Sequence, residues 1–145
     1  MEDETLYRTI LVPTDGSRRS RRAAEHAVDI ARASGSTIHA LYVMDVGDLD
    51  FVATPDDLAE TRRRLERKGT EYTDAVRELA ESAGVDCVTA VHSGIAPEEI
   101  VEYARENGVD LVVMGKRGRS DPDKPLLGSI TNRVVRTADV PVQTV

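Results

Sequence analysis

Cysteine, tryptophan and lysine are scarce in this chain of 145 residues. It contains one cysteine, no tryptophan, and 3 lysines beside 16 arginines. Because a disulfide needs two cysteines, the single Cys87 excludes an intrachain disulfide and a cysteine-based metal cluster. We interpret Cys87 as a packed thiol on a strand, because no base lies near it in sequence. This cysteine usage favours the cytoplasm as the location.

Long apolar runs are also missing. The longest are four or five residues, such as "ALYV" and "LVVM", whereas a membrane-spanning helix needs about 20. The beginning, "MEDETLYRTI", is acidic and lacks the positive region and apolar stretch of a signal peptide. Hydrophobic residues make up 40% and charged residues 31% of the chain, as in globular proteins. We therefore expect one soluble domain over residues 1–145, with no membrane partner.

Positive charge is outweighed by negative charge, with 19 Lys and Arg against 26 Asp and Glu and a net charge of −7. A polyanion is repelled by such a surface, so we expect no nucleic-acid partner. Two basic stretches, "RRSRR" (18–22) and "RRRLERK" (62–68), lie on expected helices among acids. Aromatic residues for base stacking do not interleave with them. We interpret both stretches as solvated helix faces.

Short β-branched runs alternate with longer amphipathic segments along the whole chain. This alternation is typical of βαβ units around a parallel sheet. Gly35 and Gly108 stand where helices should end, and Pro97 stands in an expected first turn. We expect strands over 7–14, 37–44, 85–94, 110–115 and 141–145, and helices over 17–34, 56–83, 96–108 and 129–138.

Five strands in strict alternation with four helices predict a single α/β domain with an open, doubly wound, five-stranded parallel sheet. Crossover connections are right-handed, and helices must cover both faces of such a sheet. Ligands of these folds bind beyond the carboxyl ends of the strands, where the strand order reverses. Candidate site residues should therefore follow the strands.

The stretch "VPTDGS" ends the first expected strand. Asp15 there could hydrogen-bond a ligand hydroxyl or a base edge, or coordinate a cation. Alternatively, Asp15 or Ser17 only caps the following helix, a role worth about 1 kcal/mol. This stretch alone leaves both interpretations open.

A second motif, G-x2-G-x9-G-[ST], begins after the fourth expected strand. Gly115 and Gly118 permit close approach of a ligand to the backbone, and Gly128 with Ser129 begins the last helix. A helix start offers free N–H groups and about half a positive charge, which suits phosphate. Ser129 and Thr131 could add hydroxyl donors. The motif lacks the lysine placement of a Walker loop, and no G-x-G-x-x-G follows the first strand, so both of those nucleotide-binding classes are disfavoured.

The stretches "ILVPTDGS", "LVVMGKRG", "LLGSITNRVV" and "ADVPVQTV", in this order, resemble the ATP-binding subgroup of the universal stress protein family. The resemblance covers essentially the whole chain. It implies a Rossmann-like fold of the adenine nucleotide alpha hydrolase type and a nucleotide-dependent regulator of the stress response. ATP, or AMP or ADP in its place, would be the ligand, and Mg²⁺ could accompany it. Asp121 and Asp123 could meet such a metal.

Carried over by position, the resemblance implies a role for each part of the two motifs. The end of the first strand lines the adenosine end, and two apolar side chains flank adenine. The first two glycines let the chain pass close to ribose and phosphates, while the start of the last helix binds the phosphate tail. In the same order these residues are Pro13, Thr14 and Asp15; Val43 and Met114; Gly115 and Gly118; and Gly128, Ser129, Ile130 and Thr131.

One stretch departs from the family pattern. Between the first two glycines, family members often carry small, polar or histidine side chains, whereas this chain has Lys116 and Arg117. Arg119 and Lys124 follow shortly after. We hypothesise that some of these cations clamp the phosphates and offset the repulsion from a net charge of −7. The alternative is a solvated charged loop.

The final strand, 141–145, is uncharged and lies at one edge of the expected sheet, where something should pair with it. The resemblance implies a homodimer joined through this strand, besides a protein partner of unknown identity. The acidic, lysine-poor composition is similar to that of salt-loving archaea, so we expect a haloarchaeal source.

Two alternative functions stay open. One is a slow ATPase or phosphotransferase that uses Asp15 or a metal-held water, and the other is a nucleotide-free dimeric stress protein. A response-regulator receiver is disfavoured, because "AVHSG" supplies no aspartate at the end of the third strand.

Overall fold

The computed structural model describes residues 6–45, 54–117 and 127–145. The predicted order of strands and helices is confirmed, and each boundary lies within two residues of the predicted one. In chain order the elements are β1 (Thr9–Pro13), α1 (Arg18–Ser34), β2 (Thr37–Asp45), α2 (Pro55–Ser82), β3 (Cys87–Gly94), α3 (Ala96–Glu106), β4 (Leu111–Met114), α4 (Ser129–Thr137) and β5 (Val142–Thr144).

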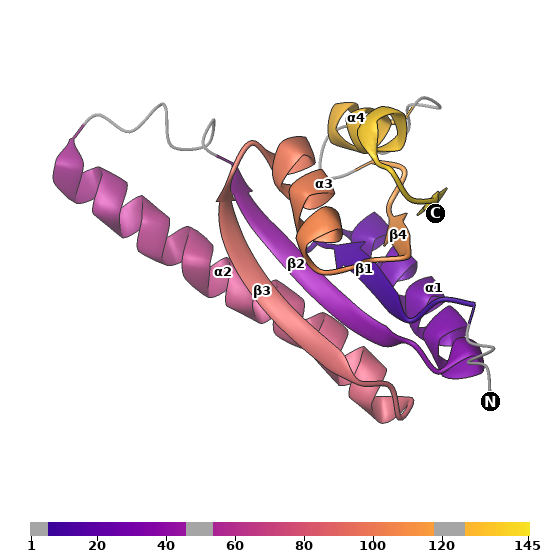
Figure 1. The fold of residues 1–145 in the computed structure, drawn as a ribbon. Coiled ribbons are helices and arrows are strands. Elements are labelled where there is room, and N and C mark those ends of the chain that lie inside the picture. The colour runs from indigo at the N-terminus through magenta and orange to yellow at the C-terminus, as the bar shows by residue number, and fades with distance from the viewer. Residues whose placement is uncertain (1–5, 46–53, 118–126) are drawn as a thin grey trace.

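The strands form one parallel sheet in the order β3-β2-β1-β4-β5 (Figure 1). In the central strand, Ile10 pairs with Ile38 of β2 on one side and with Leu111 of β4 on the other. The chain therefore winds outward from β1 first in one direction and then in the other. This confirms the predicted open, doubly wound sheet, and it places the reversal of strand order between β1 and β4.

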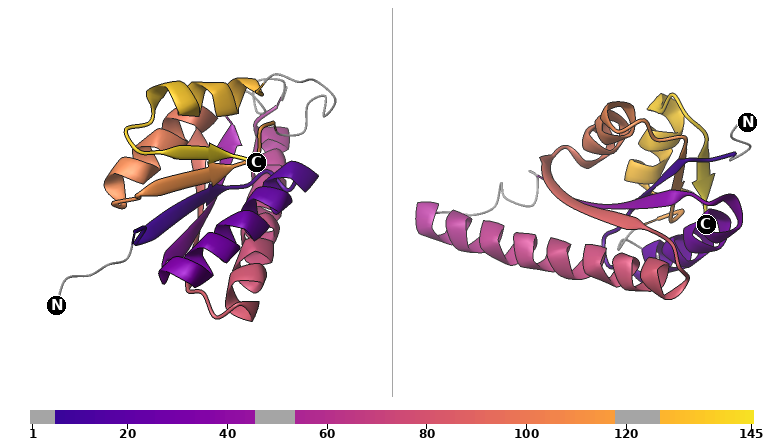
Figure 2. Two further views of the ribbon diagram at one scale, coloured as in Figure 1. Left: turned by 90° about the vertical axis from the view of Figure 1, so that its right-hand side faces the viewer. Right: turned by 60° about the horizontal axis from the view of Figure 1, so that its bottom comes forward.

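Helices cover both faces of the sheet, with α1 and α2 on one side and α3 and α4 on the other (Figure 2). Alternate residues of β1 point to opposite faces, so Ile10 and Val12 pack beneath α1 and α2, while Leu11 packs beneath α3 and α4. All three are fully buried. Because neither face of β1 meets water, polar side chains can gather only beyond its ends.

Helix α1 approaches the sheet closely because its inner face is built from alanine. Ala23, Ala27 and Ala31 recur at helical spacing and are buried against β1 and β2. Ser17 caps the start of the helix by accepting a hydrogen bond from the Ser20 N–H, and Gly35 ends the helix with a φ of 72°. The left-handed conformation at a helix end favours glycine, so the predicted end signal is confirmed.

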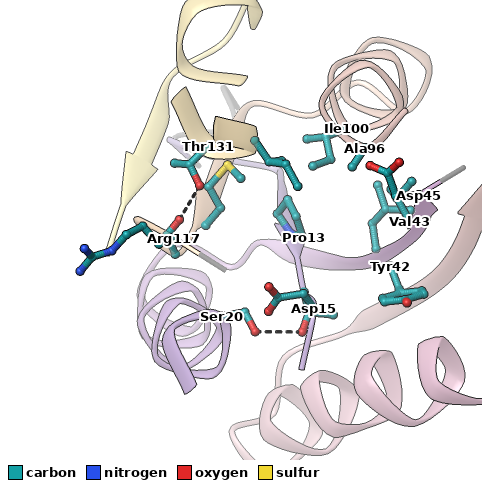
Figure 3. Close-up of a pocket in the computed structure, with 15 residues that line it drawn as sticks. Pro13, Asp15, Ser20, Tyr42, Val43, Asp45, Ala96, Ile100, Arg117 and Thr131 are labelled. Atoms are coloured by element: carbon teal, nitrogen blue, oxygen red, sulfur yellow. Dashed lines mark hydrogen bonds between the residues drawn. The ribbon is translucent and has the colours of Figure 1, made fainter. Parts of the chain in front are cut away.

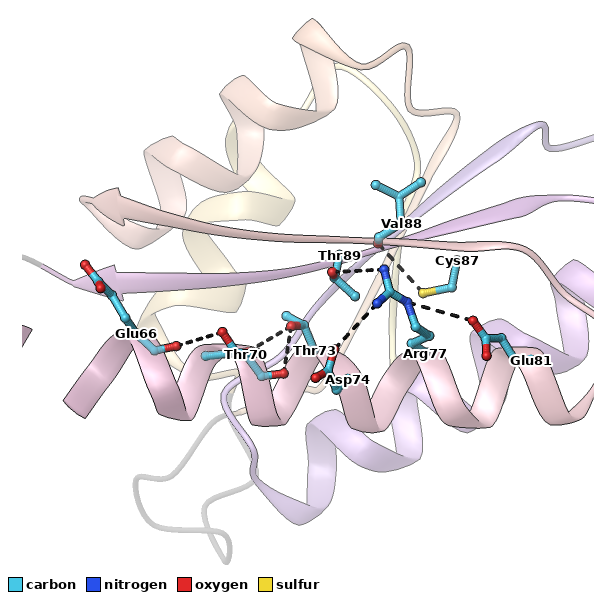
Figure 4. A network of polar contacts seen from close by, with 10 residues as sticks. Glu66, Thr70, Thr73, Asp74, Arg77, Glu81, Cys87, Val88 and Thr89 are labelled. Carbon is cyan, nitrogen blue, oxygen red and sulfur yellow. Dashed lines mark hydrogen bonds and ion pairs between the residues drawn. The ribbon is translucent and has the colours of Figure 1, made fainter. Parts of the chain in front are cut away.

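Helix α2 packs on β2 and β3 through its C-terminal half, while its N-terminal part projects past the ends of these strands (Figure 1). Arg77 fastens the packed half by donating to the Thr89 hydroxyl over 3.2 Å and by pairing with Asp74 and Glu81 (Figure 4). Leu58, an apolar residue in the first turn of α2, is 36% exposed. Helical periodicity alone does not reveal where the supporting sheet ends.

Cys87 lies at the beginning of β3, and its thiol approaches the Val88 carbonyl oxygen (Figure 4). Burial raises the pKa of this thiol to about 11. The thiol is therefore protonated at neutral pH, which agrees with the interpretation of Cys87 as a packed residue. No helix in the described parts of the chain is long and apolar enough to cross a membrane.

On the opposite face, His39 of β2 lies in a half-buried cluster with α3. Its Nδ1 lies 2.7 Å from the Tyr103 hydroxyl, and the Tyr103 ring also contacts the His92 ring edge-on. Burial lowers the pKa of His39 from its ordinary value of 6.5 and raises that of Tyr103. The folded state therefore favours a neutral His39.

The neutral His39 makes stability depend on pH in a defined direction. Because its folded pKa lies below 6.5, the unfolded chain takes up the proton first as the pH falls, and folding stability decreases below about pH 6.5. We expect His39→Gln to lose less stability than the unmodified protein between pH 7.5 and pH 5.5. Urea unfolding at both pH values measures this difference, and equal losses in the two proteins would contradict it.

Candidate functional site

A cavity of about 200 Å³ opens at the carboxyl ends of the strands, beside the reversal of strand order (Figure 3). Segments far apart in the sequence meet there: the ends of β1, β2 and β4 and the beginnings of α1, α3 and α4. The lining residues are Pro13, Thr14, Asp15, Ser20, Leu41, Tyr42, Val43, Asp45, Ala96, Ile100, Met114, Gly115, Arg117, Ile130 and Thr131.

The turn after β1 forms one side of the cavity. Thr14 continues the sheet by donating its N–H to the Leu41 carbonyl oxygen over 2.9 Å. Asp15 then accepts the Ser17 N–H at its Oδ1 over 2.9 Å, while Gly16 takes a φ of 77°. Ser17 is the helix cap. Asp15 therefore orders the turn and lines the cavity at once, so the two interpretations of this stretch are compatible.

The opposite side is built where the chain leaving β4 meets the beginning of α4. The Gly128 N–H donates to the Lys116 carbonyl oxygen, and the Thr131 hydroxyl donates to the Gly115 carbonyl oxygen, both over 2.8 Å. Thr131 is 3% exposed. These two bonds place residues that are separated in sequence at a fixed distance from each other.

The glycines of this region make the junction possible. A Cβ on Gly115 would lie 3.1 Å from the backbone of Arg19 in α1, and one on Gly128 would lie 3.2 Å from the Cα of Arg117. Both distances are tighter than ordinary contacts. The absence of a side chain at these two positions therefore serves the packing of backbone segments, in addition to any approach by a ligand.

The beginning of α4 is suited to an anion. Its N-cap residue, Gly128, provides no side-chain hydrogen bond, and its first turn holds no acid. The first turns of α2 and α3 each carry two acids, and α1 is capped by Ser17. Among the described helices, α4 thus combines uncapped N–H groups with a first turn that has no negative charge.

The structure gathers nine of the predicted site residues in the cavity wall. They are Pro13, Thr14, Asp15, Val43, Met114, Gly115, Arg117, Ile130 and Thr131. Gly128 and Ser129 lie at the start of α4 and do not line the cavity. Lys116 follows β4 and does not line it either. Gly118 lies outside the described residues, together with Arg119, Asp121, Asp123 and Lys124.

Of the two described cations of the predicted clamp, Arg117 lines the cavity and Lys116 does not. Arg117 is buried at 8% exposure, and its guanidinium extends away from the other labelled side chains (Figure 3). Lys116 is exposed and does not line the cavity. Its backbone carbonyl, which accepts the Gly128 N–H, is the part that shapes the site. The phosphate clamp stays a prediction, because Arg119 and Lys124, its other two cations, lie outside the described residues.

Sequence reasoning missed six of the lining residues, four of which fall into two groups. Asp45 and Tyr42 belong to the end of β2, and Ala96 and Ile100 belong to the first turns of α3. A signal for both was present, because the carboxyl ends of parallel strands meet at one edge of the sheet. The same reasoning that singled out the residues after β1 extends to the ends of β2 and β3. Ser20 and Leu41 complete the missed set.

The cavity lining combines carboxylates, hydroxyls and apolar side chains. Val43, Ile100 and Met114 provide apolar surface for a flat ring, and Asp15 and Asp45 provide carboxylates on the β1 and β2 side. The described lining residues include no histidine, cysteine or lysine. No group of three His, Cys, Asp or Glu side chains in the described residues could hold a metal ion. The arrangement is suited to binding a polar ligand with a flat apolar part.

Comparison with known proteins assigns this architecture to a family. Residues 6–145 match the sequence model of the universal stress protein family. The universal stress protein MJ0531 of Methanocaldococcus jannaschii is 37% identical over 139 residues, which cover 96% of this chain and 82% of that protein. The comparisons give no support to a haloarchaeal source.

Solved structures agree with the sequence match. MJ0577 of M. jannaschii superposes with a TM-score of 0.86 at 28% identity, covering 97% of this chain and 96% of that chain. A universal stress protein in complex with cAMP superposes with a TM-score of 0.74 at 27% identity, covering 97% of both chains. On the agreement of sequence, sheet order and fold, this chain belongs to the universal stress protein family.

Proposed function

We propose that the protein is a cytoplasmic, homodimeric regulator that binds an adenine nucleotide, with ATP as the preferred ligand, in the cavity at the carboxyl edge of the sheet. The observation that carries the proposal is the junction of β4 with α4, which sets an uncapped helix start beside an apolar cavity. The family membership and the cAMP complex of a family member support it.

The distribution of charge gives the nucleotide one orientation. Asp15 and Asp45 would repel phosphates but can accept hydrogen bonds from ribose hydroxyls or an adenine amino group. The uncapped N–H groups of α4 attract an anion instead. The nucleoside therefore lies toward β1 and β2, with adenine against Val43 and Met114, and the phosphates point toward the start of α4.

The cavity encloses only part of such a ligand. Its volume of about 200 Å³ is below the range of about 300–1,000 Å³ that is typical of small-molecule sites. The described residues thus suffice to hold the base and sugar, while the phosphates extend along the surface at the α4 start. The described residues offer no cluster of ligands for Mg²⁺, and Asp121 and Asp123, which could meet a metal carried by ATP, lie outside them.

The described lining residues are suited to binding a nucleotide rather than to catalysing a reaction of it. The described lining contains hydroxyls, carboxylates and an arginine, but no histidine or cysteine that could serve as base or nucleophile. We therefore favour a nucleotide-dependent regulator, in which ATP stabilises one conformation recognised by a protein partner. The competing function is a slow ATPase or phosphotransferase. A multiple-turnover assay with Mg²⁺ separates the two, because binding without release of ADP excludes the enzyme.

A charge placed at the start of α4 tests the phosphate end of the site. We expect Ser129→Asp to weaken ATP binding about tenfold, or ~1.4 kcal/mol, and to weaken adenosine binding much less. An acid in the first turn favours the helix itself, so the fold should keep its thermal stability. Titration calorimetry with ATP and with adenosine measures the two affinities.

The matched control is Ser129→Asn, which has a similar shape and no charge. It should keep an ATP affinity within about twofold of the unmodified protein, a change below ~0.5 kcal/mol. Equal losses of ATP and adenosine affinity in Ser129→Asp would contradict the orientation. Failure of the unmodified protein to bind either ligand would overturn the proposal and leave the nucleotide-free dimer.

The edge strand β5 supports the homodimer. It pairs with β4 alone among the described strands, and its three residues are uncharged. The Pro141 carbonyl and the Val145 N–H bond to β4. Because backbone groups alternate along a strand, those of Val142 and Thr144 face the free edge. That edge can accept the same strand of a second copy about a two-fold axis.

Removing one outward N–H tests this edge. We expect Thr144→Pro to convert the dimer to a monomer, because proline cannot donate to a strand across the interface while its bonds to β4 are unaffected. Thr144→Val keeps the N–H and should remain dimeric. Light scattering coupled to gel filtration measures the mass, and a dimeric Thr144→Pro with a native circular dichroism spectrum would exclude β5 as the interface.

A further inference from the structure

Two tyrosines connect the long helix α2 to the cavity wall. A Cβ built on Gly16 would lie 2.4 Å from the Cε1 atom of Tyr72. The Tyr72 ring therefore fills the space that a side chain at position 16 would need. Gly16 also has a φ of 77°, so this position requires glycine for two separate reasons.

The second contact interlocks with the first. A Cβ on Gly69 would lie 2.5 Å from the Cδ2 atom of Tyr42, so the Tyr42 ring packs directly on the backbone of α2. The rings of Tyr42 and Tyr72 meet edge to face, with centroids 5.7 Å apart and planes at 65°. Gly69, unfavourable in the interior of a helix, is explained by this contact. The same turn of α2 thus contacts the Tyr42 ring at Gly69 and carries the Tyr72 ring.

One ring lines the cavity, and the other contacts the turn beside it. Tyr42 lines the cavity, and Figure 3 shows it between the cavity and α2. Tyr72 does not line the cavity, but it rests on the residue that follows Asp15. Two local hydrogen bonds hold the turn itself: Asp15 accepts the Ser17 N–H over 2.9 Å, and the Thr14 hydroxyl accepts the Gly16 N–H over 3.3 Å. The Tyr72 ring closes this turn from the outside.

We propose that Tyr72 is a positioning residue of the nucleotide site, which holds the turn after β1 and thereby aims Asp15 into the cavity. This inference rests on the proposed nucleotide binding. As a consequence, the position of α2 on the sheet influences nucleotide affinity through Tyr72, although Tyr72 itself does not line the cavity. Any partner that shifts α2 would change nucleotide affinity through the same ring.

A double-mutant cycle on ATP affinity tests the proposal. We expect Tyr72→Leu to weaken ATP binding about fivefold to tenfold, and Tyr72→Phe, which keeps the ring, to restore most of the loss. In an Asp15→Asn background, the effect of Tyr72→Leu should shrink to less than about twofold, because the group it positions has been changed. An equal loss in both backgrounds would show a merely structural role and overturn the proposal.

Val76→Ala provides the matched control on the same helix. Val76 is 3% exposed and packs one turn further along α2, within the core cluster. It should lower the melting temperature without changing ATP affinity. If Val76→Ala weakens ATP binding as much as Tyr72→Leu, general loosening of α2 explains both, and the positioning role is wrong.

Hydrogen exchange in the ligand-free protein gives an independent readout. Tyr72→Leu should speed exchange at the Ser17 N–H, which Asp15 holds, relative to the Val12 N–H in the core of β1. Unchanged exchange at Ser17 would count against the proposal even if affinity fell. Failure of the unmodified protein to bind ATP would overturn the nucleotide site together with Tyr72's role in it, whereas full ATP affinity in Tyr72→Leu would overturn the role of Tyr72 alone.

Discussion

The site depends on one close approach, that of the chain leaving β4 to the beginning of α4. Two hydrogen bonds of 2.8 Å, from the Gly128 N–H and the Thr131 hydroxyl, fix this junction, and a side chain at Gly115 or Gly128 would crowd it. Because α4 is anchored here, its uncapped N–H groups keep a constant position relative to the apolar wall that Met114 provides. The uncapped helix start and the apolar wall, which the proposed function assigns to phosphate and adenine, are neighbours because of this contact.

The sheet explains why the polar groups collect at this edge. The central strands are covered on both faces, and a charged side chain within them would be buried without water. Asp15 and Asp45 instead stand at the ends of β1 and β2, where the layers part. The strand order reverses between β1 and β4. Beside this point, α1 and α2 cover one face of the sheet, and α3 and α4 cover the other. The opening that results is bordered by several helix starts.

The order of strands and helices could be predicted from the sequence, because hydrophobic periodicity and the residues that end helices are local features. Gly35 and Pro97 mark boundaries that the structure confirms. The site was only partly predictable, because contacts between distant segments leave no local pattern. Glycine at position 115 was noted, but its crowding by the Arg19 backbone depends on how α1 packs. The direction of the Arg117 guanidinium and the contribution of Ile100 likewise follow from tertiary packing.

The interlocked rings of Tyr42 and Tyr72 bear on how strongly the proposed site can bind. A wall that becomes ordered only when the ligand arrives takes the cost of that ordering from the free energy of binding. A wall that is ordered beforehand avoids this cost. The turn at Asp15 is held from inside by its own hydrogen bonds and from outside by the Tyr72 ring, while Tyr42 is seated on Gly69. In the role proposed for Tyr72, the packing of α2 would contribute to nucleotide affinity by ordering this turn before the ligand binds.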